Sequence, residues 1–200
     1  MIGKTKIGVI VLAAGASRRL GFPKQLVEFK GKPLLQHSMD VAESLEFDCR
    51  ILMLGSKAET IGKELKIRNF TIVINEQWGL GMGTSISKGV SAALNVKSDL
   101  DHILILLSDQ PFVTKEKIQE LIRIQLENKK PATFSEYTGE VGVPAIFSKE
   151  TFSDLMMLKK DQGAKKLILD EKISFETIKF EGGNFDVDTA KDVELLKQME

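Results

Sequence analysis

The chain contains very little cysteine and histidine, and this excludes several kinds of site. Cys49 is the single cysteine among 200 residues, so an intrachain disulfide and a zinc site built from cysteines are both excluded. Because Cys49 lies at the start of an apolar run, we expect a small buried thiol rather than a reactive nucleophile. His37 and His102 have no partner at metal-ligand spacing, and we expect both to be structural. The sequence also lacks a Ser–His–Asp arrangement and a nucleophile elbow.

Long apolar runs and an excess of one charge are missing as well. No run approaches the roughly 20 apolar residues that cross a bilayer, and the first residues lack the apolar region and cleavage site of a signal peptide. We therefore expect a cytoplasmic protein without membrane contact. The chain has 28 basic and 28 acidic residues. This zero net charge argues against a dedicated nucleic-acid binder, which usually shows a strong basic excess.

What the sequence does contain is an alternation of short apolar runs with helical stretches. We predict strands over residues 7–13, 50–54, 70–74, 102–107, 132–135, 143–147 and 173–180, the last at a sheet edge. Helices are predicted over residues 33–45, 57–65, 84–94 and 115–127, with short ones after 148 and around 163–167, and a final one after 189. This alternation predicts a single α/β domain over residues 1–200. We expect a Rossmann-like three-layer α/β/α sandwich around a mostly parallel mixed sheet.

The loop after the first strand has the composition of a phosphate-binding loop. Its small residues let backbone amides approach a ligand, and Arg19 and Lys24 can neutralise phosphate. It is not a Walker A loop, because Phe22 stands where that motif has lysine, and no GxGxxG follows the strand. A flexible, solvated turn with surface cations is the alternative interpretation.

Two further segments carry carboxylates at places where a metal can bind. Asp109 comes directly after the strand 102–107, where Mg²⁺ can combine a carboxylate with phosphate oxygens and water. The alternative is a helix cap, but Thr114 already suits that role. Asp186 and Asp188 precede the final helix. Considered alone, this pair favours capping over metal binding.

Residues 75–85 have glycines at positions 79, 81 and 83, which permit unusual backbone angles. We expect Thr84 or Ser85 to cap the following helix, whose first amides then point outward. Considered alone, such glycines indicate only tight turns. Trp78 suits a core position or the wall of a ligand site equally well.

Together these segments resemble one family, the MobA-like NTP transferases among the GT-A-type nucleotidyltransferases. Residues 12–24 resemble the signature loop LAAGxSxRxGxPK, and the supporting motifs follow in family order: GMGTS at 81–85, DQP at 109–111, VPAIF at 143–147, DQGAK at 161–165 and DVDT at 186–189. The resemblance covers nearly the whole chain. It is greatest to the molybdenum cofactor cytidylyltransferases, because Ala13-Ala14-Gly15 stands where the guanylyltransferases typically have a Gly-Gly pair.

The resemblance implies a fold of the nucleotide-diphospho-sugar transferase type and a role for each matching residue. Arg19, Lys24 and Asp109 would be catalytic, and Asp109 and Asp188 would hold Mg²⁺. The N-terminal half would bind the nucleotide, through Leu12, Ala13, Ala14, Gly15, Ser17, Arg19, Gly21, Lys24, Gly81, Gly83, Thr84, Ser85 and Asp109.

The implied reaction is Mg²⁺-dependent transfer of CMP from CTP to the phosphate of molybdopterin or molybdenum cofactor, with release of pyrophosphate. The C-terminal half would bind this acceptor, with Tyr137 and residues 139–144 as its readable signals. Two alternatives stay open. One is a cytidylyltransferase for a sugar or polyol phosphate, and the other is a non-catalytic factor that carries molybdenum cofactor to a molybdenum hydroxylase partner. A carrier would not need two metal-binding carboxylates.

The zero net charge also conceals an asymmetry along the chain. Residues 15–32 hold five Lys or Arg and one acid, whereas residues 181–200 hold six acids and two Lys. A basic phosphate loop and an acidic C-terminal segment with a metal ligand would together form the two halves of a site for an NTP with Mg²⁺.

Overall fold

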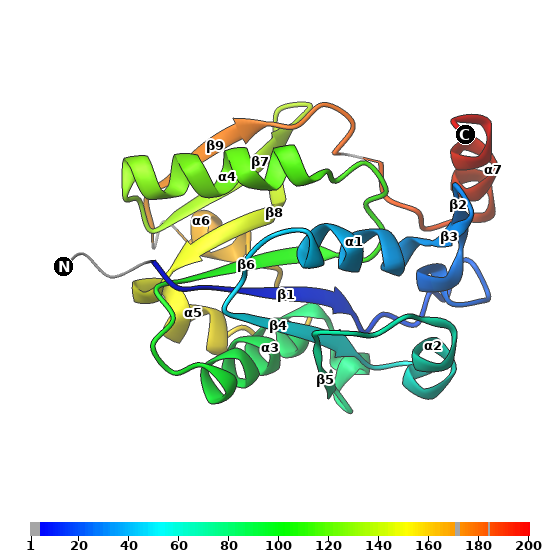
Figure 1. Ribbon diagram of the computed structural model, residues 1–200, viewed down its shortest axis with the longest axis horizontal. Coiled ribbons are helices and arrows are strands. Elements are labelled where there is room, and N and C mark those ends of the chain that lie inside the picture. The colour runs from blue at the N-terminus through cyan, green and yellow to red at the C-terminus, as the bar shows by residue number, and fades with distance from the viewer. Residues whose placement is uncertain (1–4, 171–172, 184) are drawn as a thin grey trace.

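The computed structural model describes residues 5–170, 173–183 and 185–200, and this part of the chain is built on one seven-stranded sheet (Figure 1). The signal-peptide expectation falls partly on residues 1–4, outside these ranges. A small hairpin, β2 (Glu28–Phe29) with β3 (Lys32–Pro33), lies apart from the main sheet. The strands of the main sheet are β1 (Ile7–Ala13), β4 (Cys49–Leu54), β5 (Thr71–Ile74), β6 (His102–Leu107), β7 (Ala132–Tyr137), β8 (Glu140–Ser148) and β9 (Phe175–Lys179).

The sheet is mostly parallel, with one antiparallel strand inserted in its second half. The strand order is β5-β4-β1-β6-β8-β7-β9. β1 pairs in parallel with β4, where Gly8 faces Cys49, and with β6, where Ile7 faces His102. β8 runs antiparallel to β6 and β7, and β9 returns parallel to β7 at the edge. The expected mixed sheet with the last strand at an edge is confirmed.

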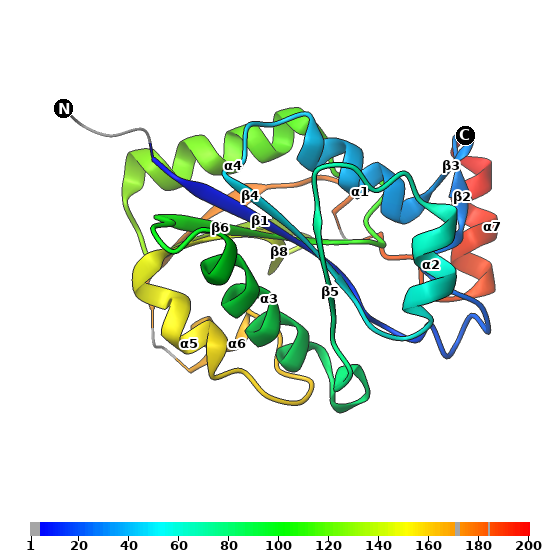
Figure 2. The same ribbon diagram turned by 60° about the horizontal axis from the view of Figure 1, so that its bottom comes forward.

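Helices cover both faces of the sheet and make the expected three layers (Figure 2). One face carries α3 (Met82–Val96), α5 (Phe152–Met156) and α6 (Lys166–Leu169). The other face carries α1 (Leu34–Glu43), α2 (Ala58–Glu64) and α4 (Lys115–Asn128), while α7 (Ala190–Gln198) stands at one end beside the hairpin. None of the helices in the described ranges is long and apolar enough to cross a bilayer.

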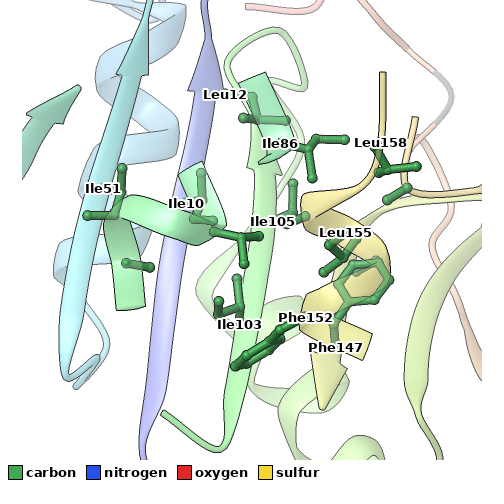
Figure 3. Packing of buried hydrophobic residues seen from close by; sticks show 14 of the residues in the cluster. Ile10, Leu12, Ile51, Ile86, Ile103, Ile105, Phe147, Phe152, Leu155 and Leu158 are labelled. Atoms are coloured by element: carbon green, nitrogen blue, oxygen red, sulfur yellow. The ribbon is translucent and has the colours of Figure 1, made fainter. Parts of the chain in front are cut away.

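The central strand β1 is buried on both faces, which explains its continuous apolar sequence. Ile10 and Leu12 point into the cluster beneath α3 and α5, where they pack with residues such as Ile86 (Figure 3). Val9 and Val11 point into the opposite cluster, beneath α1 and α4. Each such buried side chain contributes about 1.5–3 kcal/mol. The loop that follows Ala13 therefore starts from a rigid position.

A third, smaller cluster fixes the C-terminal helix on the hairpin. Thr189 caps α7 by accepting a hydrogen bond from the backbone of Asp192, whose carboxylate accepts one in return from the backbone of Thr189, and the two residues form a capping box. Packing against the hairpin places the segment before α7 next to the loop after β1. The buried members of this cluster are Val27, Phe29, Leu34, Val187 and Leu196.

Two local predictions differ from the structure. The prediction that Thr84 or Ser85 caps the third helix is wrong. Gly81 is the N-cap instead, with a left-handed φ of 114°, and the helix already begins at Met82. The predicted strands 132–135 and 143–147 are too short, because a tight turn joins the two strands in the structure. Thr138 and Gly139 both have positive φ angles, 52° and 80°, so the two strands extend to meet them.

The residues expected to be structural are structural. Cys49 is 5% exposed, and burial raises the pKa of its thiol to about 11, so it is a poor nucleophile. His37 Nε2 lies 2.7 Å from the carbonyl oxygen of Phe29. His102 is half-buried on β6, and burial lowers its pKa.

Candidate active site

The site lies where the loops after β1 and β6 meet. The backbone amide of Ser108 donates to the carbonyl oxygen of Leu12 at 3.2 Å, which ties the two strand ends together. The chain leaves β1 toward β4 on one side and later returns as β6 on the other, so this is a topological switch point. Ligands of open α/β sheets bind at such points. A cavity of about 430 Å³ opens there, with Ala13, Ala14 and Asp109 in its wall.

Lys24 joins two carboxylates beside this cavity. Its ammonium contacts Asp109 and lies 2.6 Å from Oδ1 of Asp188. The side chains of Lys24, Asp109 and Asp188 are 16%, 11% and 33% exposed. Burial alone would lower the pKa of Lys24, but the two carboxylates outweigh it and raise that pKa above its ordinary value. Lys24 is therefore charged at neutral pH, and its ammonium can bind an anion.

The two arginines of the first loop have different positions. Arg19 Nη2 pairs with Oδ2 of Asp188 at 2.5 Å on an exposed surface, outside the cavity wall. Arg18 lines the cavity, although the arginine of the signature loop is Arg19. Exposed ion pairs contribute little to stability, so Arg19 is easily released toward an incoming anion.

A buried glutamine fixes the shape of the loop that follows β1. Gln25 is fully buried, and its Nε2 donates to the carbonyl oxygens of Ala13 at 2.9 Å and Gly15 at 3.1 Å. The hydroxyl of Ser17 accepts from the backbone amide of Lys24 at 2.9 Å. Ser17 therefore stabilises the conformation of the loop and does not line the cavity. The turn at Gly21 needs a φ of 81°, which glycine adopts without strain.

The start of α3 forms the far wall of the cavity. Asn75 is 2% exposed, and its amide donates to the hydroxyls of Thr84 at 2.8 Å and Ser85 at 2.9 Å. Thr84 donates in turn to the carbonyl of Gly81 at 2.8 Å and does not line the cavity. Ser85 lines the cavity.

The turn of residues 159–162 docks on this helix start and explains two glycines. The amide of Gly83 donates to the carbonyl of Lys160 at 2.8 Å. A side chain at Gly83 would meet the backbone of Lys159 at 2.8 Å, and one at Gly81 would collide with Asp161. These glycines therefore permit close packing, and Asp161 becomes part of the cavity wall.

Beyond Asp109 lies a second group of polar residues, toward β8. Gln110 is 4% exposed and donates to the carbonyls of Val143 at 3.0 Å and Gly183 at 3.3 Å. Burial, together with the nearby charge of Asp109, raises the pKa of Asp186 to about 6. The Tyr137 side chain packs against Gly142 and Gly183, and burial together with Asp186 and Asp109 raises its pKa. Tyr137 is the residue that the sequence indicated for the acceptor side.

The structure brings most of the expected nucleotide-binding residues together, with clear exceptions. Those in the cavity wall are Leu12, Ala13, Ala14, Gly15, Lys24, Gly81, Ser85 and Asp109. Those outside it are Ser17, Arg19, Gly21, Gly83 and Thr84, and Asp188 reaches the site through Lys24. Further residues of the cavity wall, which were not among the expected binding residues, include Arg18, Gln25, Met82 and Asp161, and Asn75 supports Ser85. Arg18, Met82 and Asp161 lie within the quoted family motifs, whereas Gln25 follows the signature loop and had no signal of its own.

The donor set fits a divalent cation that a ligand completes. Asp109 and Asp188 already face a common point, because one ammonium contacts both. In the described ranges no group of three or more His, Cys, Asp or Glu side chains surrounds a metal position. Mg²⁺ characteristically uses one or two carboxylates together with phosphate oxygens and water. The two carboxylates are therefore sufficient when a phosphate-bearing ligand is present.

Comparison with known proteins agrees with this geometry. The model of the MobA-like NTP transferase domain matches residues 9–174. The bifunctional protein GlmU of Desulfitobacterium hafniense (strain Y51) is 33% identical over 126 residues, which is 62% of this chain but 26% of GlmU. The chain thus spans about a quarter of that relative. The purine catabolism protein PucB of Bacillus subtilis (strain 168) is 28% identical, with 96% of each chain covered.

Solved structures share the whole fold. The crystal structure of Rv0371c from Mycobacterium tuberculosis H37Rv matches with a TM-score of 0.85 and 28% identity, over 98% of this chain and 100% of that one. A second structure of Rv0371c, in complex with manganese, matches with a TM-score of 0.81 over the same shares.

Proposed function

Since the chain belongs to the MobA-like NTP transferase family, we propose that it transfers CMP from CTP to the phosphate of molybdopterin or molybdenum cofactor, releasing pyrophosphate. One observation carries most weight: Lys24 joins Asp109 and Asp188 at the strand ends that form the cavity. A cation and two carboxylates at this point supply the positioning and charge stabilisation that in-line transfer between phosphates requires.

The reaction forms one bond to phosphorus and breaks another. An oxygen of the acceptor phosphate attacks the α-phosphorus of the nucleotide. The bond from that phosphorus to the bridging oxygen breaks, and pyrophosphate leaves with the electron pair. Because a phosphate is already ionised at neutral pH, no general base is needed. This agrees with a cavity wall that contains neither His37 nor His102.

Acidic and basic residues of the site have different proposed roles toward the phosphates. We assign Asp109 and Asp188 as the ligands of Mg²⁺, which when bound neutralises phosphate charge and orients the attacking and leaving oxygens. Lys24 leaves its two carboxylates and contacts the phosphates, helped by Arg18 and Arg19. The structure of Rv0371c in complex with manganese supports a divalent cation as the partner of these carboxylates.

We place the nucleotide on the N-terminal half and the acceptor on the C-terminal half. Ala13-Ala14-Gly15, in the cavity wall, supports cytidine over guanosine by its resemblance to the cytidylyl branch. Gln110 donates to Val143 on β8 and Tyr137 packs against the neighbouring Gly142, so we assign this group, with Asp186, to the acceptor phosphate. CTP as the donor places the reaction in the cytoplasm, and a molybdenum hydroxylase is the partner that would receive the product.

Pyrophosphate release is the test of this function. The protein is incubated with Mg²⁺ and each of the four NTPs, with and without molybdenum cofactor. Release that needs both CTP and the cofactor is expected. Release with GTP alone among the nucleotides, or with a sugar or polyol phosphate in place of the cofactor, contradicts the assignment. Cofactor binding without release with any NTP identifies a carrier instead.

A matched pair of variants controls for folding. Asp109→Ala removes a proposed metal ligand and is expected to abolish release while leaving the circular dichroism spectrum unchanged. Glu59→Gln changes an exposed acid on α2 that pairs with Lys63 on the same helix, and should keep full activity. Unimpaired Mg²⁺-dependent release by Asp109→Ala refutes the role of Asp109.

A further inference from the structure

Asp161 brings a negative charge into a cavity that is proposed to bind a polyanion. Its carboxylate lies in the cavity wall and is exposed to solvent. In the described ranges it has no ion pair and no hydrogen bond. The backbone of the 159–162 turn, which carries it, is fixed on the start of α3 by the bond from the amide of Gly83 to the carbonyl of Lys160. The carboxylate is thus free, and its backbone is held in place.

The charge distribution of the cavity decides which part of a nucleotide can meet Asp161. Arg18, Lys24 and the metal-binding carboxylate of Asp109 mark the end that takes phosphates. Asp161 contacts Gly81 at the start of α3, on the wall that also holds Ser85. Because like charges repel, a triphosphate at the first end leaves the nucleoside to face Asp161. A carboxylate there can only accept hydrogen bonds.

Ser85 supplies the complementary donor on the same wall. The backbone amide of Gln77 donates to Oδ1 of Asn75 at 3.0 Å, so the nitrogen of that side chain must be the group facing Ser85. The hydroxyl of Ser85 therefore accepts from Asn75, and its own hydrogen is left to donate to a ligand in the cavity that Ser85 lines. Asp161 and Ser85 together present one acceptor and one donor.

We propose that Asp161 is a specificity-determining residue that selects a pyrimidine with an amino group. The inference rests on the proposed function and names the base that the same cavity prefers. Cytosine offers an exocyclic amino group to the Asp161 carboxylate and ring acceptors to the Ser85 hydroxyl. Uracil presents a carbonyl oxygen in place of that amino group, and two acceptors facing each other leave both unpaired. Sites built this way reject the mismatched analogue strongly.

Nucleotide binding tests this without any acceptor. Trp78 is the single tryptophan and lines the cavity, so its fluorescence reports binding directly. CTP, UTP and 2′-deoxy-CTP are titrated with Mg²⁺ into the unmodified protein, Asp161→Asn and Asp161→Ala. Asp161→Asn keeps the shape of the side chain, and its amide can donate to uracil. We expect the unmodified protein to prefer CTP over UTP, and Asp161→Asn to reduce that preference at least tenfold, with the CTP to deoxy-CTP ratio unchanged.

Each contrary result has a distinct meaning. An equal loss of affinity for all three nucleotides shows that Asp161 only shapes the wall, and a change confined to the CTP to deoxy-CTP ratio assigns it to the ribose. Either result overturns the proposal, as does an unmodified protein that does not prefer CTP. Because these ratios need no turnover, the proposal can stand while the proposed function fails for lack of pyrophosphate release. Asp170→Asn, on an acid outside the cavity wall, is the matched control.

Discussion

The ammonium of Lys24 lies 2.6 Å from the Asp188 carboxylate, so the first loop and the segment before the last helix meet at one ion pair. The same ammonium contacts Asp109. In the ligand-free protein, the cation that is proposed to serve the phosphates therefore stands between the two carboxylates that are proposed to hold the metal. A divalent cation has to displace it.

Replacing Lys24 is therefore expected to separate metal affinity from turnover. Lys24→Met removes a positive charge whose repulsion of a nearby cation is worth about 1–4 kcal/mol, so Mn²⁺ should bind at least about fivefold more tightly without nucleotide. Turnover should fall, because the variant lacks the ammonium that is proposed to contact the phosphates of the nucleotide. Electron paramagnetic resonance of free Mn²⁺ measures the first effect. Lys63→Met, on exposed α2, is the control and should change neither quantity. Unchanged or weaker Mn²⁺ binding by Lys24→Met contradicts the placement.

Gln25 offers a second prediction, because it is fully buried and its side-chain amide supports the loop after β1. Gln25→Ala leaves the carbonyl oxygens of Ala13 and Gly15 without their donor. Unsatisfied buried acceptors cost about 1–3 kcal/mol, and the loop that is proposed to hold the nucleotide should loosen. We expect a lower free energy of unfolding in urea and a raised KM for the nucleotide. Gln198→Ala, on the exposed side of α7, should alter neither. A KM equal to that of the unmodified protein would show that the loop needs no such support.

Glycine substitutions test the docking of the 159–162 turn. Gly83→Ala introduces a methyl group 2.8–2.9 Å from backbone atoms of Lys159 and Gln162, none of which belongs to a flexible side chain. Overpacking of this kind costs about 1–3 kcal/mol. Gly62→Ala, where nothing lies within 4 Å on α2, should instead stabilise the helix by about 0.5–1 kcal/mol. Thermal unfolding compares the two. If Gly83→Ala and Gly62→Ala had equal melting temperatures, the close packing of the 159–162 turn on α3 would be contradicted.

The raised pKa of Asp186 predicts that the stability of the fold depends on pH. Its folded-state pKa is raised to about 6, so between its ordinary value and 6 the folded state holds more protons than the unfolded state. Stability contributed by this group is complete below its ordinary pKa and is lost as the pH rises through 6. Asp186→Asn should therefore raise the free energy of unfolding at pH 7.5 by about 1–2 kcal/mol, allowing for partial solvent screening.

At pH 4 the gain from Asp186→Asn should nearly vanish. Urea denaturation at the two pH values measures the difference, and Asp170→Asn is the comparison. A gain that is the same at both pH values would contradict the raised pKa.

The sheet could be predicted from the sequence because its strands carry their own signal. Ile7–Ala13 and His102–Leu107 are continuous apolar runs, and such runs bounded by glycine or polar residues indicate buried strands. The strand ends then predicted that the loops containing Lys24 and Asp109 meet. The antiparallel position of β8 was predicted only as a mixed second half, because its pairing depends on a two-residue turn with positive φ angles.

The supporting residues of the site could not be predicted in the same way. Gln25 and Asn75 are polar residues that look solvent-exposed in the sequence, and only the folded chain shows them buried and bonded to the loops. Asp161 reaches the cavity through contact with Gly81, across a sequence separation that no local pattern reports. Arg18 and Arg19 are neighbours in sequence, and the local backbone, with Ser17 at a positive φ, decides which one faces the cavity.

Transfer of a labelled phosphorus from CTP to the acceptor is the most direct test of the chemistry. The unmodified protein is incubated with Mg²⁺, molybdenum cofactor and CTP labelled with ³²P either at the α- or at the γ-position. Attack on the α-phosphorus beside Lys24 and Asp109 predicts that the α-label appears in the cofactor product and the γ-label in pyrophosphate. Transfer of the γ-label to the cofactor, or no transfer of either label, would contradict nucleotidyl transfer at this site.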